Sequence, residues 1–239
     1  MDITKTKLLV SVKNVHEALL ALQADVDFID LKDPEVGALG SLDDEVSKEI
    51  IQSVNKRAVI SATIGEHHQY QQTVLDVIDT KISMGVDVVK LSITPHFEDV
   101  TFLQSLKKII SDQNIKLVAV MFADEAIGFD WIPKLAKIGF YGVMLDTSNK
   151  NHNLLSSISE DQIQAFVNDC KSYHLQTGLA GSLRVEYIDH LIKHSPGYIG
   201  FRSGVCVNFQ RDSDLLLELV LSAKDKLYKH NINGARMYA

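Results

Sequence analysis

Three lysines of this sequence lie in or just after short apolar runs. Lys32 ends the run FIDLK, Lys90 interrupts the run VVKLS, and Lys150 follows Asp146 by four residues. Lysines gathered out of water disfavour one another's charge, so at least one amine can have its pKa lowered toward neutrality and attack a carbonyl. The expected chemistry is imine formation, with Asp30 and Asp146 balancing charge and carrying protons.

The lysines can act together only if the backbone turns them to the same side. Successive side chains of a β-strand point to opposite faces. Asp30 and Lys32 therefore share one face of their run, and Lys90 lies on the face opposite to Val89 and Leu91. We expect the charged faces to form the interior of a closed sheet. A single strand-end lysine is more often an exposed charge, but three of them favour a common site.

Eight apolar runs rich in β-branched residues predict strands, and they begin about 27 residues apart on average, which suits one βα unit each. They span residues 8–12, 28–32, 58–64, 88–93, 117–122, 142–146, 177–180 and 198–202. Between them, apolar residues recur at helical spacing. The expected helices span 15–22, 45–54, 73–84, 102–110, 163–173 and 215–227.

This alternation predicts an α/β fold, a single (βα)8 TIM barrel covering residues 1–239, since such barrels usually have about 250 residues. A doubly wound open sheet is the main alternative. The four prolines are scattered, and no Pro-, Gly- or Ser-rich linker divides the chain, so one domain is favoured over two. In a barrel, catalytic groups gather at the carboxyl ends of the strands.

Composition restricts the partners. The formal net charge is −7, which argues against a nucleic-acid or membrane-surface protein. The apolar run near the N-terminus is too short for a signal peptide or a membrane span. Cys170 and Cys206 are far apart and form no metal-ligand pattern, so we expect a cytoplasmic protein without a metal site, in which Cys206 is structural. The sequence leaves open whether the chain forms a homo-oligomer.

Two small-residue loops predict a phosphate site. Gly181 and Ser182 follow the seventh expected strand, and Arg202, Ser203 and Gly204 end the eighth. Barrels commonly bind phosphate through backbone N–H groups of these two loops. Arg202 is expected to add charge-assisted hydrogen bonds. The alternative is a pair of tight turns with a structural arginine.

Together these segments resemble the (5-formylfuran-3-yl)methyl phosphate synthases, also called 4-(hydroxymethyl)-2-furancarboxaldehyde-phosphate synthases. The resemblance covers nearly the whole chain and rests on the order of its pieces. These are LLVS at 8–11, IDLKDP at 29–34, GALG at 37–40, SAT at 61–63, VK at 89–90, MLDT at 144–147 with Lys150, LAGS at 179–182 and GFR at 200–202.

The resemblance implies a (βα)8 lyase that joins two molecules of glyceraldehyde 3-phosphate into a furan aldehyde phosphate, with loss of phosphate and water. The product would serve the furan part of methanofuran-type C1 carriers. The resemblance also implies that Lys32 is the Schiff-base lysine and that Lys90 is the proton-transferring lysine. Asp30, Asp146 and Lys150 would be their neighbours in the active site. Because a protonated iminium is itself an electron sink, no cofactor is expected.

Three stretches depart from the family pattern. LSITP follows Lys90, where the family favours Val-Gly-Leu, and NHN follows Lys150 in place of a glycine-bearing turn. Ser203 and Gly204 begin SGVC in place of Gly-Ala-Ala-Cys. Three rival functions stay open at this point. They are another Schiff-base aldolase on a sugar phosphate, an isomerase or epimerase that forms no imine, and a non-catalytic barrel that binds a phosphometabolite.

Overall fold

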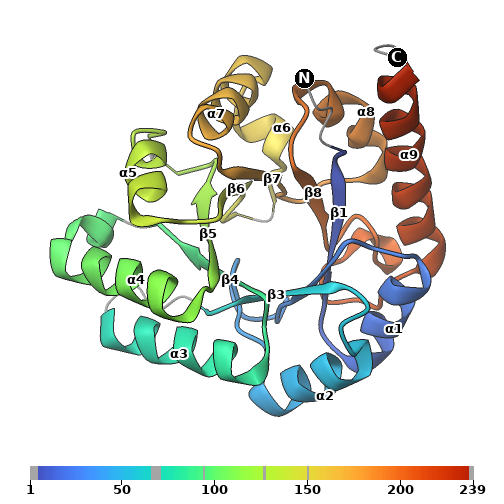
Figure 1. The fold of residues 1–239 in the computed structure, drawn as a ribbon. Helices are drawn as coiled ribbons and strands as arrows, with labels where there is room; N and C mark the ends of the chain where they lie inside the picture. Colours follow the sequence, from blue (N-terminus) through green and yellow to red (C-terminus); the bar gives the residue numbers. More distant parts are fainter. Residues whose placement is uncertain (1–4, 66–70, 94, 126–127, 150, 237–239) are drawn as a thin grey trace.

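A computed structural model describes residues 5–65, 71–93, 95–125, 128–149 and 151–236 of the chain. Its strands run parallel in sequence order, and β8 pairs with β1 to close the barrel (Figure 1). The strands are β1 Lys7–Val12, β2 Phe28–Leu31, β3 Val59–Thr63, β4 Val88–Ser92, β5 Lys116–Phe122, β6 Gly142–Asp146, β7 Gln176–Leu179 and β8 Tyr198–Phe201. The predicted TIM barrel is confirmed, and closure between β8 and β1 excludes the open sheet.

Helices surround the barrel (Figure 1). They are α1 Val15–Gln23, α2 Asp44–Val54, α3 Gln71–Met84, α4 Val100–Gln113, α5 Trp131–Ile138, α6 Leu154–Ser157, α7 Glu160–Ser172, α8 Ile188–Leu191 and α9 Leu217–Arg236, with short 3-10 turns η1 Pro95–Glu98, η2 Val185–Tyr187, η3 Ile192–His194 and η4 Val207–Phe209. The six predicted helices correspond to α1 to α4, α7 and α9. Helices α5, α6 and α8 occupy stretches without a predicted helix because they are too short to show a repeating apolar stripe.

Helix α9 continues to Arg236, past its predicted end at residue 227. Among residues 217–232, whose burial the structure describes, Leu227 is the last that is buried in the core, and the apolar stripe read from the sequence stops there. The described helices include none that is long and apolar enough to cross a membrane.

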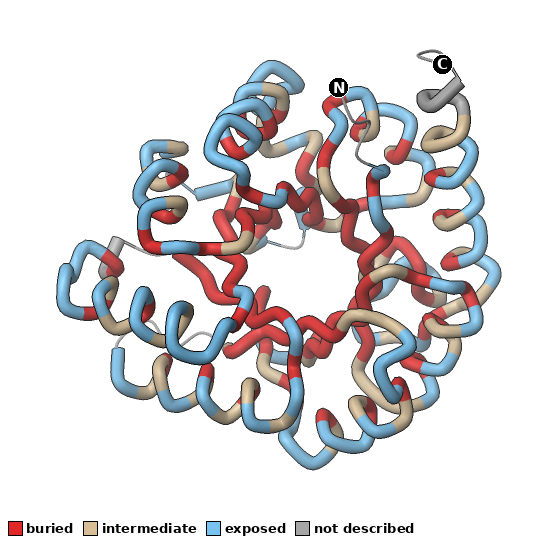
Figure 2. The backbone as a smooth tube through the Cα atoms, viewed as in Figure 1, coloured by how far each residue is buried: buried red, intermediate tan, exposed pale blue. Residues whose placement is uncertain are grey.

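Two apolar layers follow from the alternation of side chains along the strands. Ile29, Leu31, Val89 and Leu91 belong to the layer between the barrel and its helices. A separate cluster that includes Phe28 fills the inside of the barrel. Buried residues accordingly follow the strands and the inner sides of the helices, whereas exposed residues face outward (Figure 2). As expected, successive side chains along each strand point alternately into the barrel and toward the helices.

Aromatic side chains fill the inside of the barrel at the amino ends of β2 and β8. The rings of Phe28 and Tyr198 lie 5.5 Å apart, centroid to centroid. A Cβ at Gly178 would lie 2.3 Å from the Tyr198 ring, so a side chain there would displace the tyrosine. Phe28 and Tyr198 lie at the first positions of β2 and β8, which leaves the carboxyl ends of the strands for polar groups.

Candidate active site

Asp30 and Lys90 form a buried ion pair inside the barrel. Asp30 Oδ1 lies 2.7 Å from Lys90 Nζ, and the two residues are 0% and 3% exposed. Ser61 donates its hydroxyl to Oδ1 at 2.7 Å, and Ser11 donates to Oδ2 at 2.8 Å. The strand register explains these bonds, since Asp30 pairs with Ser11 on β1 and with Ser61 on β3. Each buried charge therefore has its counter-charge and hydrogen bonds in place.

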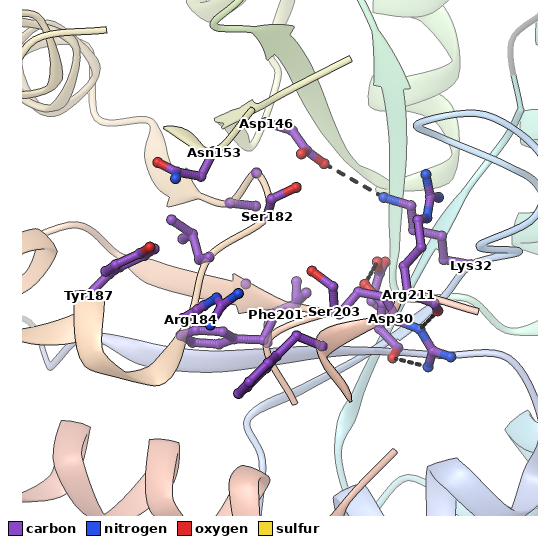
Figure 3. A pocket seen from close by; sticks show the side chains of 18 of the residues that line it. Asp30, Lys32, Asp146, Asn153, Ser182, Arg184, Tyr187, Phe201, Ser203 and Arg211 are labelled. Carbon is purple, nitrogen blue, oxygen red and sulfur yellow. Dashed lines mark hydrogen bonds and ion pairs between the residues drawn. The ribbon is translucent and has the colours of Figure 1, made fainter. Parts of the chain in front are cut away.

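Lys32 and Asp146 form a second, longer pair. Lys32 follows the last residue of β2, and Asp146 is the last residue of β6. Lys32 Nζ lies 3.6 Å from Asp146 Oδ2 (Figure 3), and the residues are 7% and 5% exposed. The other oxygen of Asp146 accepts the N–H of Thr147 at 2.7 Å, which fixes the carboxylate. The structure thus places two lysines, each beside a carboxylate, inside the same barrel.

Both pairs line one cavity of about 460 Å³ at the carboxyl ends of the strands. Its other walls come from the loops after β6, β7 and β8. Figure 3 shows Arg184 and Tyr187 on one side of it and Lys32 and Arg211 on the other. This volume is within the range of about 300–1,000 Å³ that is usual for small-molecule sites. The arrangement can hold a small carbonyl compound against an amine, with an acid–base pair beside it.

The loop after β7 brings backbone to the cavity wall. Gly181 and Ser182 have φ angles of +105° and +47°, so two successive residues are left-handed. A Cβ at Gly181 would lie 3.0 Å from the backbone nitrogen of Thr147, which only glycine avoids. The Gly181 carbonyl accepts the N–H of Leu154 at 3.0 Å, which joins this loop to the segment after β6. No side chain at position 181 separates the backbone from the cavity.

The loop after β8 packs directly on the loop after β7. Gly204 pairs with Arg184 in an isolated parallel bridge, and a Cβ at Gly204 would lie 2.0 Å from the Leu183 carbonyl oxygen. Ser203 lines the cavity beside them. The structure therefore brings together the two small-residue loops for which the sequence predicts phosphate binding.

Arg202 is part of the cavity wall, but protein acceptors surround its guanidinium. Nη1 donates to Glu17 at 2.5 Å and to the Ser11 carbonyl at 3.1 Å. Nη2 donates to Glu17 at 3.2 Å and to the Ser213 carbonyl at 2.9 Å, and Nε donates to the Arg211 carbonyl at 2.6 Å. A guanidinium has five N–H donors, and all five are engaged. Arg202 thus holds α1 and the segment after β8 together, and no donor is left for a phosphate.

Two further arginines, which no sequence motif indicated, also line the cavity. The guanidinium of Arg184 lies 4.2 Å from the centre of the Phe209 ring and has no hydrogen bond or ion pair among the described residues. Among the described residues, the guanidinium of Arg211 donates one hydrogen bond, from Nη2 to the Gly37 carbonyl at 2.8 Å. Burial lowers the pKa of Arg211, although a guanidinium stays protonated in proteins. The only sequence signal for either residue is a positive charge shortly after a phosphate-type loop.

Lys150 lies outside the described residues. The segment before it is anchored, since Ser148 and Asn149 both donate backbone N–H groups to Asp124 at 2.8 Å. Within the part of the chain that the structure describes, no three His, Cys, Asp or Glu side chains are grouped as metal ligands.

The cysteines are buried. Burial raises the pKa of the Cys206 thiol to about 11 and that of Cys170 to about 12. Cys206 Sγ donates to the Arg202 carbonyl at 3.1 Å. Both groups are therefore thiols near neutral pH. Cys206, which follows β8, is accordingly not a thiolate nucleophile at neutral pH.

The chain is similar in sequence to a set of furan phosphate synthases. A family model described as 4-HFC-P synthase matches residues 8–224. A Methylorubrum extorquens protein to which (5-formylfuran-3-yl)methyl phosphate synthase activity is ascribed is 37% identical over 84% of this chain and 83% of its own length. The (5-formylfuran-3-yl)methyl phosphate synthase of Methanobrevibacter smithii is 32% identical over 86% of this chain and 92% of its own length.

Solved structures with the same fold are more distant in sequence. Phosphoribosyl anthranilate isomerase from Thermus thermophilus has a TM-score of 0.66 at 12% identity, covering 94% of this chain and 100% of its own. The 3-hexulose-6-phosphate synthase from Salmonella typhimurium has a TM-score of 0.63 at 14% identity, also covering 94% of this chain and 100% of its own. At these identities the likeness concerns the barrel alone.

Proposed function

The chain belongs to the 4-HFC-P synthase family, whose members are named as enzymes, and from this premise we propose that it makes (5-formylfuran-3-yl)methyl phosphate from two molecules of glyceraldehyde 3-phosphate. The product has six carbons and one phosphate. Two triose phosphates supply these atoms when one phosphate and two waters leave, so the reaction needs no oxidant or reductant. The product would serve the furan part of methanofuran-type C1 carriers.

One observation carries this proposal. Lys32 and Lys90 each lie beside a carboxylate in the same cavity, next to the loops after β7 and β8. A lysine beside an acid–base pair suits imine formation followed by proton transfer. Small-residue loops at this end of a barrel suit a phosphate.

We assign the Schiff base to Lys32. Its amine would attack the carbonyl of one triose phosphate, directly or after isomerisation to the ketone, and water would leave to give an iminium. The iminium acidifies the adjacent C–H, and Lys90 with Asp30 would move that proton. The carbon then attacks the carbonyl of the second molecule. Lys90, assisted by Asp30 or Asp146, would also move the protons during phosphate elimination and ring dehydration.

The phosphate of the first molecule is assigned to the backbone of Gly181, Ser182, Ser203 and Gly204. Arg184 would supply the cation there, because it follows the β7 loop and its donors have no acceptor among the described residues. Arg202, which the sequence analysis expected to bind phosphate, is assigned instead to holding the β8 loop in place. Lys150 would meet the phosphate of the second molecule.

Product identification tests this proposal. The protein is incubated with glyceraldehyde 3-phosphate, and the near-ultraviolet absorbance, inorganic phosphate and phosphorylated product are followed together. We expect a furan aldehyde chromophore, with one phosphate released for two triose phosphates consumed. A sugar phosphate without the chromophore would instead favour an aldolase. No net conversion, with binding alone, would favour a non-catalytic barrel.

A further inference from the structure

A second cavity adjoins the first at the same end of the barrel. It has about 450 Å³ and is lined by Phe122 at the end of β5, by Ser148 and Asn149 after β6, and by Gly37 and Ala38 after β2. Phe122 pairs in register with Asp146, so this cavity lies next to the Lys32–Asp146 pair. A condensation needs its second substrate at such a place, because the new bond forms beside the iminium carbon.

Arg211 is the residue shared by the linings of the two cavities. The lining of the second cavity includes two charged residues, Glu125 and Arg211. Arg211 is therefore the positively charged residue of that lining among the described residues. Arg211 would therefore supply positive charge to a phosphate in this cavity, in addition to Lys150, which is assigned to the same phosphate.

The position of Arg211 is fixed at two points. Its carbonyl accepts Arg202 Nε at 2.6 Å, and Arg202 is in turn paired with the buried Glu17. Its own Nη2 donates to the Gly37 carbonyl at 2.8 Å, in the loop that follows Lys32. The remaining N–H groups of the guanidinium have no acceptor within the described part of the chain, and the residue lines both cavities. A half-buried arginine mounted in this way can bind a dianion with little loss of side-chain entropy.

We propose that Arg211 binds the phosphate of the second triose phosphate, which occupies the second cavity, while the first molecule is held on Lys32. This assignment rests on the proposed function. It gives each phosphate its own arginine, with Arg184 and Arg211 on opposite sides of the first cavity (Figure 3).

The test separates binding of the first molecule from condensation with the second. Arg211→Gln, Arg211→Lys and the matched variant Arg184→Gln are compared with the unmodified protein. Borohydride trapping at Lys32, over a range of glyceraldehyde 3-phosphate concentrations, reports the first molecule. Furan formation over the same range reports both molecules. Thermal melting shows that each variant is folded.

For Arg211→Gln we expect trapping to half-saturate at the same concentration as in the unmodified protein. Furan formation should need a concentration about 10 to 100-fold higher, the loss usual for a hydrogen bond to a charged group. Arg211→Lys should recover part of this loss. Arg184→Gln should instead weaken trapping and furan formation together.

Two results would overturn the assignment. Arg211→Gln could weaken trapping as much as furan formation, which would place Arg211 at the first phosphate. Alternatively, it could leave furan formation unchanged, which would leave Arg211 without a role. An unmodified protein that gives neither adduct nor furan would overturn the proposed function itself, and this assignment with it.

Discussion

Asp30 and Lys90 are held 2.7 Å apart inside the barrel, one on β2 and the other on β4. Three donors surround the carboxylate, from Ser11, Ser61 and Lys90. Since both residues also line the cavity, the pair is preorganised for proton transfer to a bound molecule without rearrangement of the barrel.

Asp30→Asn should therefore affect both catalysis and stability. Furan formation should fall by about 10² to 10⁴-fold, the usual contribution of a positioned acid–base group. The free energy of unfolding should fall by about 3–5 kcal/mol, because Lys90 would stay buried without its counter-charge. Steady-state assays and urea unfolding measure the two effects.

The double variant Asp30→Asn/Lys90→Met separates these effects. Removing both charges should return much of the lost stability while activity stays low. A double variant as active as the unmodified protein would exclude the pair from the chemistry.

Gly181→Ala should weaken substrate binding. Its φ of +105° disfavours any side chain, and the new Cβ would meet Thr147. Gly139→Ala is a matched control, since Gly139 has a φ of +106° at the end of α5. In both variants the free energy of unfolding should fall by about 1 kcal/mol or more. Only Gly181→Ala should raise KM, by at least about tenfold. Equal KM values in the two variants would show that the loop after β7 does not bind substrate.

Arg202→Lys should destabilise the fold although it keeps the charge. A lysine ammonium has three donors and cannot reach all five acceptors of the guanidinium, which are the two oxygens of Glu17 and the carbonyls of Ser11, Arg211 and Ser213. We expect a loss of about 3 kcal/mol in urea unfolding, as is usual for a disrupted buried pair. Unchanged stability with a much higher KM would instead restore Arg202 as a direct phosphate ligand.

Alkylation of Cys206 should depend steeply on pH. Because burial raises its pKa to about 11, the thiol form persists well above neutrality. At pH 8 roughly one thiol in a thousand is ionised, so the rate with iodoacetamide should rise about tenfold per pH unit. Activity should survive treatment at pH 8, whereas urea-unfolded chain should react quickly. Rapid loss of activity at pH 7 would indicate a reactive thiol near the active-site cavity.

The sequence predicted those parts of the site that depend on strand periodicity. Asp30 and Lys90 face the cavity because alternate strand residues do so whatever the tertiary contacts are. The sequence left Arg202 open between a phosphate ligand and a structural arginine, because its partner Glu17 lies 185 residues away and meets it only when β8 closes on β1. Arg184 and Arg211 were missed for a related reason. No periodic pattern sets the direction of a loop side chain.

The proposed reaction begins with an imine between Lys32 and a triose phosphate. The most direct measurement is borohydride reduction in the presence of glyceraldehyde 3-phosphate, followed by peptide mapping by mass spectrometry. Lys116→Ala serves as a control, since Lys116 begins β5 at the other end of the barrel. We expect one adduct, on Lys32, with the mass of a triose phosphate less one oxygen, and no furan from Lys32→Ala. An unmodified Lys32 together with furan formation by Lys32→Ala would contradict it.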